Sequence, residues 1–157
     1  MLSDIVIDTN VLVHSNNPNE QRYEDCCTLL EDLLDSSTKL GVDEGFSINQ
    51  SDNRSYIGSE YINNINHGSL AFSVLSTLAA SKRILFYPKR ASRNEQRIIN
   101  QTIRNRVDRV FLGVSFNSEE KIFVSHDYED FQEPKRVFIS KEIDVEIIEA
   151  RESLTLI

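Results

Sequence analysis

Two aspartates follow the two most apolar runs of the sequence. Asp8 directly follows residues 5–7, and Asp127 comes shortly after residues 122–124. Short, continuous apolar runs of this kind predict strands buried in a parallel sheet. In open α/β sheets, ligands bind outside the carboxyl ends of the strands. We therefore expect the two carboxylates to lie at one rim of the sheet.

A third acid, Asp108, opens a predicted helix 19 residues before Asp127. Carboxylates brought together repel one another unless a cation lies between them, and Mg²⁺ and Mn²⁺ prefer oxygen ligands. Several acids beside a phosphodiester suit metal-assisted hydrolysis, because the cation acidifies a water molecule and stabilises the leaving oxygen. Each aspartate alone could merely cap a helix. Their combination favours a metal site.

The cysteines and histidines indicate no zinc site. Cys26 and Cys27 are adjacent, which excludes a disulfide framework and favours two small side chains in a helix. His14, His67 and His126 are scattered along the sequence. Alternation along the strand predicts that His126 points away from the face used by its neighbour, the aspartate at position 127.

Apolar periodicity predicts alternating strands and helices. Strands are expected at residues 5–7, 40–43, 84–87, 122–124, 137–139 and 145–148, with residues 46–48 as a hairpin arm. Helices are expected at residues 23–34, 56–65, 70–80 and 108–116, together with one that Ser92 or Asn94 caps and that runs through Val107. This pattern predicts an α/β three-layer sandwich whose central, mostly parallel sheet is flanked by helices.

The length and composition fit one ordinary domain. The chain has 157 residues, 39% of them hydrophobic and 27% charged, which allows a core without disulfides. No apolar run approaches the roughly 20 residues that cross a bilayer, and the first residues do not resemble a signal peptide. We expect a cytoplasmic protein without membrane partners.

The charge is distributed unevenly. The net charge is −8, yet residues 82–109 hold nine of the 17 basic residues and only two of the 25 acidic ones. One interpretation is a face that attracts a polyanion such as RNA, with Arg97, Arg104 and Arg109 as its contacts. The other is a solvated helix surface whose partners lie on the acidic remainder. Charge alone does not separate them.

The residues around the three acids resemble PIN-domain nucleases. Residues 6–12, with the sequence VIDTNVL, are similar to that family's opening strand and turn, and residues 124–131, VSHDYEDF, are similar to its late strand. Asp108 matches the third acid of the family in type and spacing. The resemblance spans residues 5–131 and implies a single PIN-like domain over residues 1–157, with an insertion around residues 45–55.

This resemblance implies a metal-dependent endoribonuclease that cleaves single-stranded RNA and leaves a 5′-phosphate and a 3′-hydroxyl. The expected catalytic residues and ligands of Mg²⁺ or Mn²⁺ are Asp8, Glu60, Asp108 and Asp127. Glu60 fits the family's second acid best, and Asp43 is its competitor.

Two further residues are expected to support these acids. Asn10 would orient the Asp8 carboxylate or bind a phosphate. Ser125 would bind a carboxylate or a metal-bound water.

The expected partners are single-stranded or structured RNA, an antitoxin-like inhibitor protein if the chain is a toxin of a toxin–antitoxin pair, and a second copy of the chain. Two alternatives stay open. One is a catalytically silent PIN-like module that binds RNA or protein. The other is an α/β domain phosphorylated on an aspartate, which would need a lysine at another strand end.

Overall fold

Five short apolar runs form one parallel sheet in the computed structural model, which describes residues 1–157. The strands are β1 (Asp4–Ile7), β2 (Lys39–Asp43), β3 (Ile84–Tyr87), β4 (Ile122–Val124) and β5 (Glu146–Ile148). Their spatial order is β3-β2-β1-β4-β5, and every neighbouring pair is parallel. The central strand β1 is buried along its whole length, as the continuous apolar run predicts.

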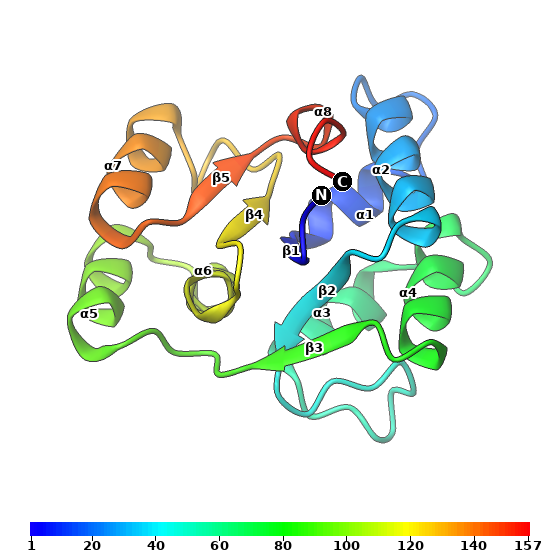
Figure 1. Ribbon diagram of the computed structural model, residues 1–157, viewed down its shortest axis with the longest axis horizontal. Coiled ribbons are helices and arrows are strands. Elements are labelled where there is room, and N and C mark those ends of the chain that lie inside the picture. Colours follow the sequence, from blue (N-terminus) through cyan, green and yellow to red (C-terminus); the bar gives the residue numbers. More distant parts are fainter.

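Eight helices connect and cover the strands. They are α1 (Thr9–His14), α2 (Tyr23–Asp35), α3 (Tyr56–Asn64), α4 (Leu70–Ala80), α5 (Arg93–Thr102), α6 (Arg106–Asn117), α7 (Glu133–Ile143) and α8 (Ala150–Ser153). Helices α2 and α4 lie on one side of the sheet, and α5, α6 and α7 lie on the other (Figure 1). The α/β architecture with helices flanking a central sheet is confirmed. None of the helices has the length and apolar content that a membrane span requires.

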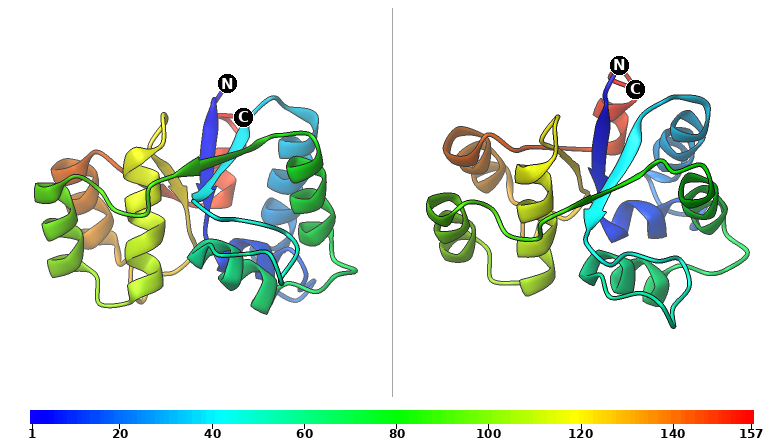
Figure 2. Two further views of the ribbon diagram at one scale, coloured as in Figure 1. Left: turned by 90° about the horizontal axis from the view of Figure 1, so that it is seen from below. Right: turned by 60° about the horizontal axis from the view of Figure 1, so that its bottom comes forward.

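The strand order creates a crevice beside β1. The chain places β2 and β3 on one side of β1 and β4 and β5 on the other, and ligands bind at such a switch point, outside the carboxyl ends of the strands. Ile7 of β1 lies opposite Val124 of β4, so both strands leave the sheet at the same level. Figure 2 shows α1 and α3 beside this rim.

Helix α3 is fastened to the ends of two strands. Asp43, the last residue of β2, accepts hydrogen bonds from the Ser55 hydroxyl and, at 2.8 Å, from the Tyr56 backbone N–H. The Tyr61 hydroxyl donates to the carbonyl oxygen of Ile7 at the end of β1. The bonds from the Tyr56 N–H and, at 3.0 Å, the Ile57 N–H to Asp43 satisfy groups that the first turn of a helix leaves free. They also fix α3 at the carboxyl rim of the sheet.

Two of the expected strands are wrong. Residues 46–48 form no hairpin arm but belong to a loop, which the bond from the Arg54 N–H to the Gly45 carbonyl closes at 2.8 Å. Residues 137–139 lie inside α7. Val137 is 63% exposed whereas Ile139 is 1% exposed, so the apolar triplet marks no continuous buried strand.

The long helix expected to run through Val107 is broken in two. Helix α5 ends at Thr102, and Asn105 caps the new helix α6 by accepting from the Val107 N–H at 2.9 Å. At the break, the Arg109 guanidinium donates to the carbonyl oxygens of Ile103 at 2.6 Å and Asn100 at 3.0 Å. These bonds satisfy carbonyl groups at the end of α5 that have no partner within the helix.

Candidate metal centre

Three carboxylates from distant parts of the sequence meet at the rim. One oxygen each of Asp8, Asp108 and Asp127 lies within 4.8 Å of the others. Asp8 follows β1, Asp108 is the third residue of α6, and Asp127 follows β4. Asp8 is 6% and Asp108 7% exposed, while Asp127 is half-buried. The prediction that the aspartates after β1 and β4 share one rim is confirmed.

Ser125 connects two of the three acids. Its hydroxyl donates to Oδ2 of Asp8 at 2.6 Å and accepts from the backbone N–H of Asp127 at 3.1 Å. Ser125 therefore binds a carboxylate, one of the two roles expected for it. Asn10 instead accepts from the His126 backbone N–H at 3.2 Å, so it joins α1 to the segment that carries Asp127.

A tight turn follows Asp127 and brings a fourth acid to the site. Oδ1 of Asp127 accepts from the backbone N–H groups of Glu129 at 2.9 Å and Asp130 at 3.0 Å. This turn brings Asp130 near Asp108, where it adds to the effect of burial in raising the pKa of Asp108. The sequence suggested only a solvated or supporting role for Asp130. Its position three residues after Asp127 was the available signal.

Arg136 holds the same segment from inside the molecule. The side chain is buried, and it donates to the carbonyl oxygens of Phe131 at 2.7 Å, Ser125 at 3.2 Å and Asp127 at 3.1 Å. The forked guanidinium suits several acceptors at once. Sequence reasoning missed Arg136, because it expected a strand to begin at the next residue.

Burial and neighbouring acids make the ionised forms of Asp8 and Asp108 unfavourable. Burial raises the pKa of Asp8 to about 6, although the Ser125 hydroxyl lowers it, and the charge of Asp127 adds to the increase. Burial also raises the pKa of Asp108 to about 8, followed by the contact with Asp130 and the charge of Asp8. No acid of the trio takes part in an ion pair. Without a cation, the folded chain therefore holds protons at this site.

The donor set fits a hard divalent cation. Oδ2 of Asp108 is buried and has no hydrogen-bond partner, and an unpaired buried carboxylate oxygen is costly. Only carboxylate oxygens converge here, which suits Mg²⁺ or Mn²⁺ better than softer metals. Asp8, Asp108 and Asp127 could each give one oxygen, with Asp130 beside them.

The structure does not bring Glu60 or Asp43 into the trio. Glu60 is half-buried on α3 and is absent from the group of carboxylates within 4.8 Å. Asp43 is buried, and both its oxygens accept hydrogen bonds from the start of α3. Asp43 thus acts as a cap, and a metal-binding role for Glu60 stays a prediction.

The three arginines expected to bind RNA differ in their surroundings. Arg97 and Arg104 are exposed and form no ion pair. Arg104 does not pair with Asp108, although one helical turn separates them in sequence. Arg109 is half-buried, and its guanidinium donates hydrogen bonds to two backbone carbonyls. It therefore stabilises the turn between α5 and α6.

The structure gathers two of the scattered histidines with a cysteine, contrary to expectation. Nδ1 of His14 lies 3.0 Å from Nδ1 of His126, and Sγ of Cys26 lies 3.9 Å from the same His126 atom. The Ala150 backbone N–H donates to Nε2 of His126 at 3.1 Å. Neutral His126 must then carry its proton on Nδ1 and donate it to His14. That proton occupies the lone pair that a metal would need.

The protonation of this cluster supports a hydrogen-bonded chain. Burial, followed by the charge of His14, lowers the pKa of His126 to about 4. Burial and then the neighbouring Cys27 raise the pKa of Cys26 to about 12, so its thiol stays protonated. Both cysteines are free, and the His126 ring contacts His14, Cys26 and Ala150, none of which belongs to the carboxylate trio.

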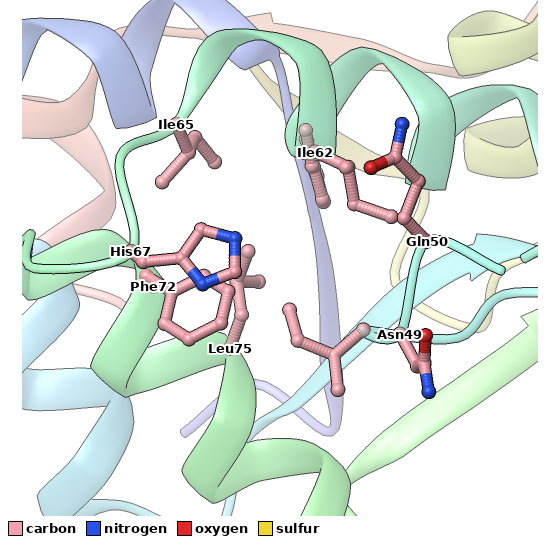
Figure 3. Close-up of a pocket in the computed structure, with 9 residues that line it drawn as sticks. Asn49, Gln50, Ile62, Ile65, His67, Phe72 and Leu75 are labelled. Carbon is pink, nitrogen blue, oxygen red and sulfur yellow. The ribbon is translucent and has the colours of Figure 1, made fainter.

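An apolar cavity of about 360 Å³ lies apart from the acids (Figure 3). It opens between the loop after β2 and helices α3 and α4, and its apolar lining includes Ile48, Ile62, Ile65, Phe72 and Leu75. None of the trio lines this cavity. The converging carboxylates are thus separate from this apolar cavity.

The chemistry of the carboxylate trio is the basis for inferring a function, since a search of protein-family models, curated proteins and solved structures found no match to this chain.

Proposed function

We propose that this protein is a metal-dependent endoribonuclease of the PIN type, acting on single-stranded RNA. The observation that carries the proposal is the meeting of Asp8, Asp108 and Asp127 within 4.8 Å, with a buried Asp108 oxygen that lacks any partner. A bound Mg²⁺ or Mn²⁺ would polarise a phosphate and lower the pKa of a water molecule.

The chain's own residues prepare the site in two ways. Ser125 and Asp127 hold the Asp8 carboxylate in place, and Arg136 holds the segment that carries them. Asp108, with a pKa of about 8, holds a proton near neutral pH when no cation is present. A cation that binds Asp108 must displace that proton into solvent, so metal binding should be stronger at higher pH.

The absence of a lysine or arginine side chain paired with the trio favours hydrolysis over aspartate phosphorylation. No lysine or arginine forms an ion pair with the trio, whereas a phosphorylated aspartate would need a lysine beside it. The unpaired basic residues of α5 support a polyanionic substrate. A toxin role is the narrower form of the proposal. We expect expression of the chain to stop cell growth, and the Asp8→Asn variant to be harmless.

The direct test is cleavage of a fluorescent single-stranded RNA in Mn²⁺ or Mg²⁺. Asp8→Asn and Asp127→Asn should abolish cleavage while the melting temperature shows a folded chain. Asp35→Asn is the matched control, because Asp35 is exposed at the end of α2. Mn²⁺ binding is measured separately by calorimetry. Binding of RNA and Mn²⁺ without turnover would favour a catalytically silent module instead.

A further inference from the structure

Two hollows with basic walls join along α5 and the start of α6. One, of about 370 Å³, reaches from Tyr56 to Arg106. The other, of about 460 Å³, follows α5 past Arg97. They share Arg90, Gln96 and Asn100 and have no acidic residue in their lining. We call this surface the basic groove and define it by its five exposed cations: Lys89, Arg90, Arg93, Arg97 and Arg106.

The cations of the basic groove have no anionic partner. The four ion pairs of the structure involve other residues, and the five side chains make no hydrogen bond to the protein. The chain has a net charge of −8, yet no acidic residue lines either hollow of the groove. Five cations gathered without acids on an otherwise acidic protein favour the approach of a polyanion to this face.

The backbone beneath the groove is fixed in place. A Cβ on Gly113 of α6 would lie 2.0 Å from the Lys89 carbonyl oxygen, so only glycine allows the segment to pass this closely. The Asn117 side chain donates to the carbonyl oxygens of Pro88 at 2.9 Å and Arg90 at 2.8 Å. The positions of Lys89 and Arg90 relative to α6 are therefore set before any ligand binds, which lowers the entropy cost of binding.

An aromatic ring from the start of α3 lines the groove. Tyr56 is 48% exposed, and the Lys89 ammonium lies 4.5 Å from the centre of its ring. Asp43 holds Tyr56 at the first position of α3 through its backbone N–H. An exposed aromatic ring beside cations provides a surface on which a nucleic-acid base can stack.

The groove and one acid of the metal centre share helix α6. Arg106 belongs to the same helical turn as Asp108, at the start of α6. A polyanion lying along the groove would thus reach the helix end that carries the buried acid. Duplex nucleic acid keeps its bases stacked on one another, whereas a single strand can offer a base to Tyr56.

Building on the proposed function, we propose that the basic groove binds the backbone of a single-stranded nucleic acid on one side of the cut, with Tyr56 stacking on a base. Binding in the groove needs no divalent cation, because its contacts are cations and an aromatic ring. The groove and the metal centre can therefore be tested independently.

The experiment measures the binding of a fluorescein-labelled oligouridylate in EDTA by anisotropy at increasing NaCl. Each phosphate contact contributes about 0.7 to the salt slope for a single strand, so five contacts predict a slope near −3.5. Arg90→Gln combined with Arg97→Gln should make the slope shallower by about 1.4. The control pair, Lys39→Gln with Arg151→Gln, removes the same charge from exposed positions elsewhere and should leave the slope unchanged.

Substitution of Tyr56 tests the stacking contact. Tyr56→Leu should weaken binding about tenfold at every salt concentration with no change in slope, whereas Tyr56→Phe should bind normally. If the double substitution in the groove and its control pair weakened oligouridylate binding equally, the groove proposal would be overturned. So would competition by polyglutamate equal to that by the single strand, since this would indicate an acidic protein partner. Metal-independent binding without any cleavage would instead contradict only the nuclease proposal.

Discussion

The Ser125 hydroxyl donates a 2.6 Å hydrogen bond to the Asp8 carboxylate. The same oxygen accepts from the Asp127 N–H, so one small side chain sets the spacing of two acids. We predict that Ser125→Ala weakens Mn²⁺ binding about tenfold, as loss of a hydrogen bond to a ligand does at other metal sites. Calorimetry measures this. The control is Ser115→Ala, since Ser115 is also buried but bonds within α6; an equal loss there would refute a specific role for Ser125.

The metal-free protein should lose stability as pH rises above neutrality, because at lower pH the opposite pKa shift of His126 offsets that of Asp8. The pKa values of Asp8, about 6, and Asp108, about 8, lie above their ordinary value of 3.8. The folded chain thus holds protons that the unfolded chain releases. This stabilisation is fully present below pH 3.8 and is lost as pH rises through about 6 and then about 8.

Melting temperatures in EDTA between about pH 4 and about pH 9 test this trend. Asp108→Asn should flatten the upper part of the curve and stabilise the metal-free chain at high pH. Added Mn²⁺ should raise the melting temperature more at high pH than at low pH, because protons compete with the cation. A melting temperature that rises with pH above neutrality in EDTA would contradict the raised pKa of Asp108.

Asp130 should matter more to metal binding than Glu60. Asp130 lies near Asp108, whereas Glu60 is outside the carboxylate group. We predict that Asp130→Asn weakens Mn²⁺ binding several-fold and lowers the pKa of Asp108, and that Glu60→Gln changes neither. Calorimetry at two pH values measures both effects. Loss of binding with Glu60→Gln alone would restore Glu60 as the missing ligand.

Replacing Arg136 should destabilise the whole protein. Its buried guanidinium bonds three backbone carbonyls, and Arg136→Lys cannot reach all three with one ammonium group. We expect a loss of about 3 kcal/mol in the free energy of unfolding, measured by urea denaturation. Arg151→Lys, at an exposed position, should cost nothing measurable. A neutral Arg136→Lys would mean that water replaces the lost donors.

The His14–His126 pair should behave as a hydrogen bond and not as a metal site. Long-range ¹⁵N spectra should show Nε2 of His126 unprotonated at neutral pH, because it accepts from Ala150. Since its pKa of about 4 lies below the ordinary 6.5, its contribution to stability is lost as pH falls through this range. Added Co²⁺ should give no thiolate absorption band; such a band from Cys26 would contradict the assignment.

The apolar runs of the sequence predicted all five strands, whether a strand is buried throughout, as β1 is, or only in part, as β3 is. Residues 5–7 and 122–124 form strands because the sheet buries them among apolar neighbours, and their carboxyl ends had to share a rim. The prediction failed at residues 137–139, where the apolar triplet mixes exposed and buried positions on α7. Periodicity over three residues does not distinguish a strand from one turn of a helix.

Within the site, the sequence predicted the residues that lie next to a helix or strand. It did not predict those that a turn or a long-range contact brings in. Asp8, Asp108 and Asp127 were found because each stands at the end or start of an element. Asp130 was missed because a side-chain-to-backbone turn carries it back to Asp108, and such a turn leaves little periodic signal. The His14–His126 contact joins positions 112 residues apart, and nothing local in the sequence indicates it.

The close passage of the Lys89 carbonyl over Gly113 fixes the spacing between the backbone of the groove and helix α6. Since backbone meets backbone there, the interval between the backbone at positions 89–90 and the helix that carries Asp108 is fixed. If a strand lies as proposed, the number of nucleotides between its anchored phosphates and the cut is constant. The cleavage products should then all extend the same number of nucleotides from the bound segment to the cut, whatever the base sequence.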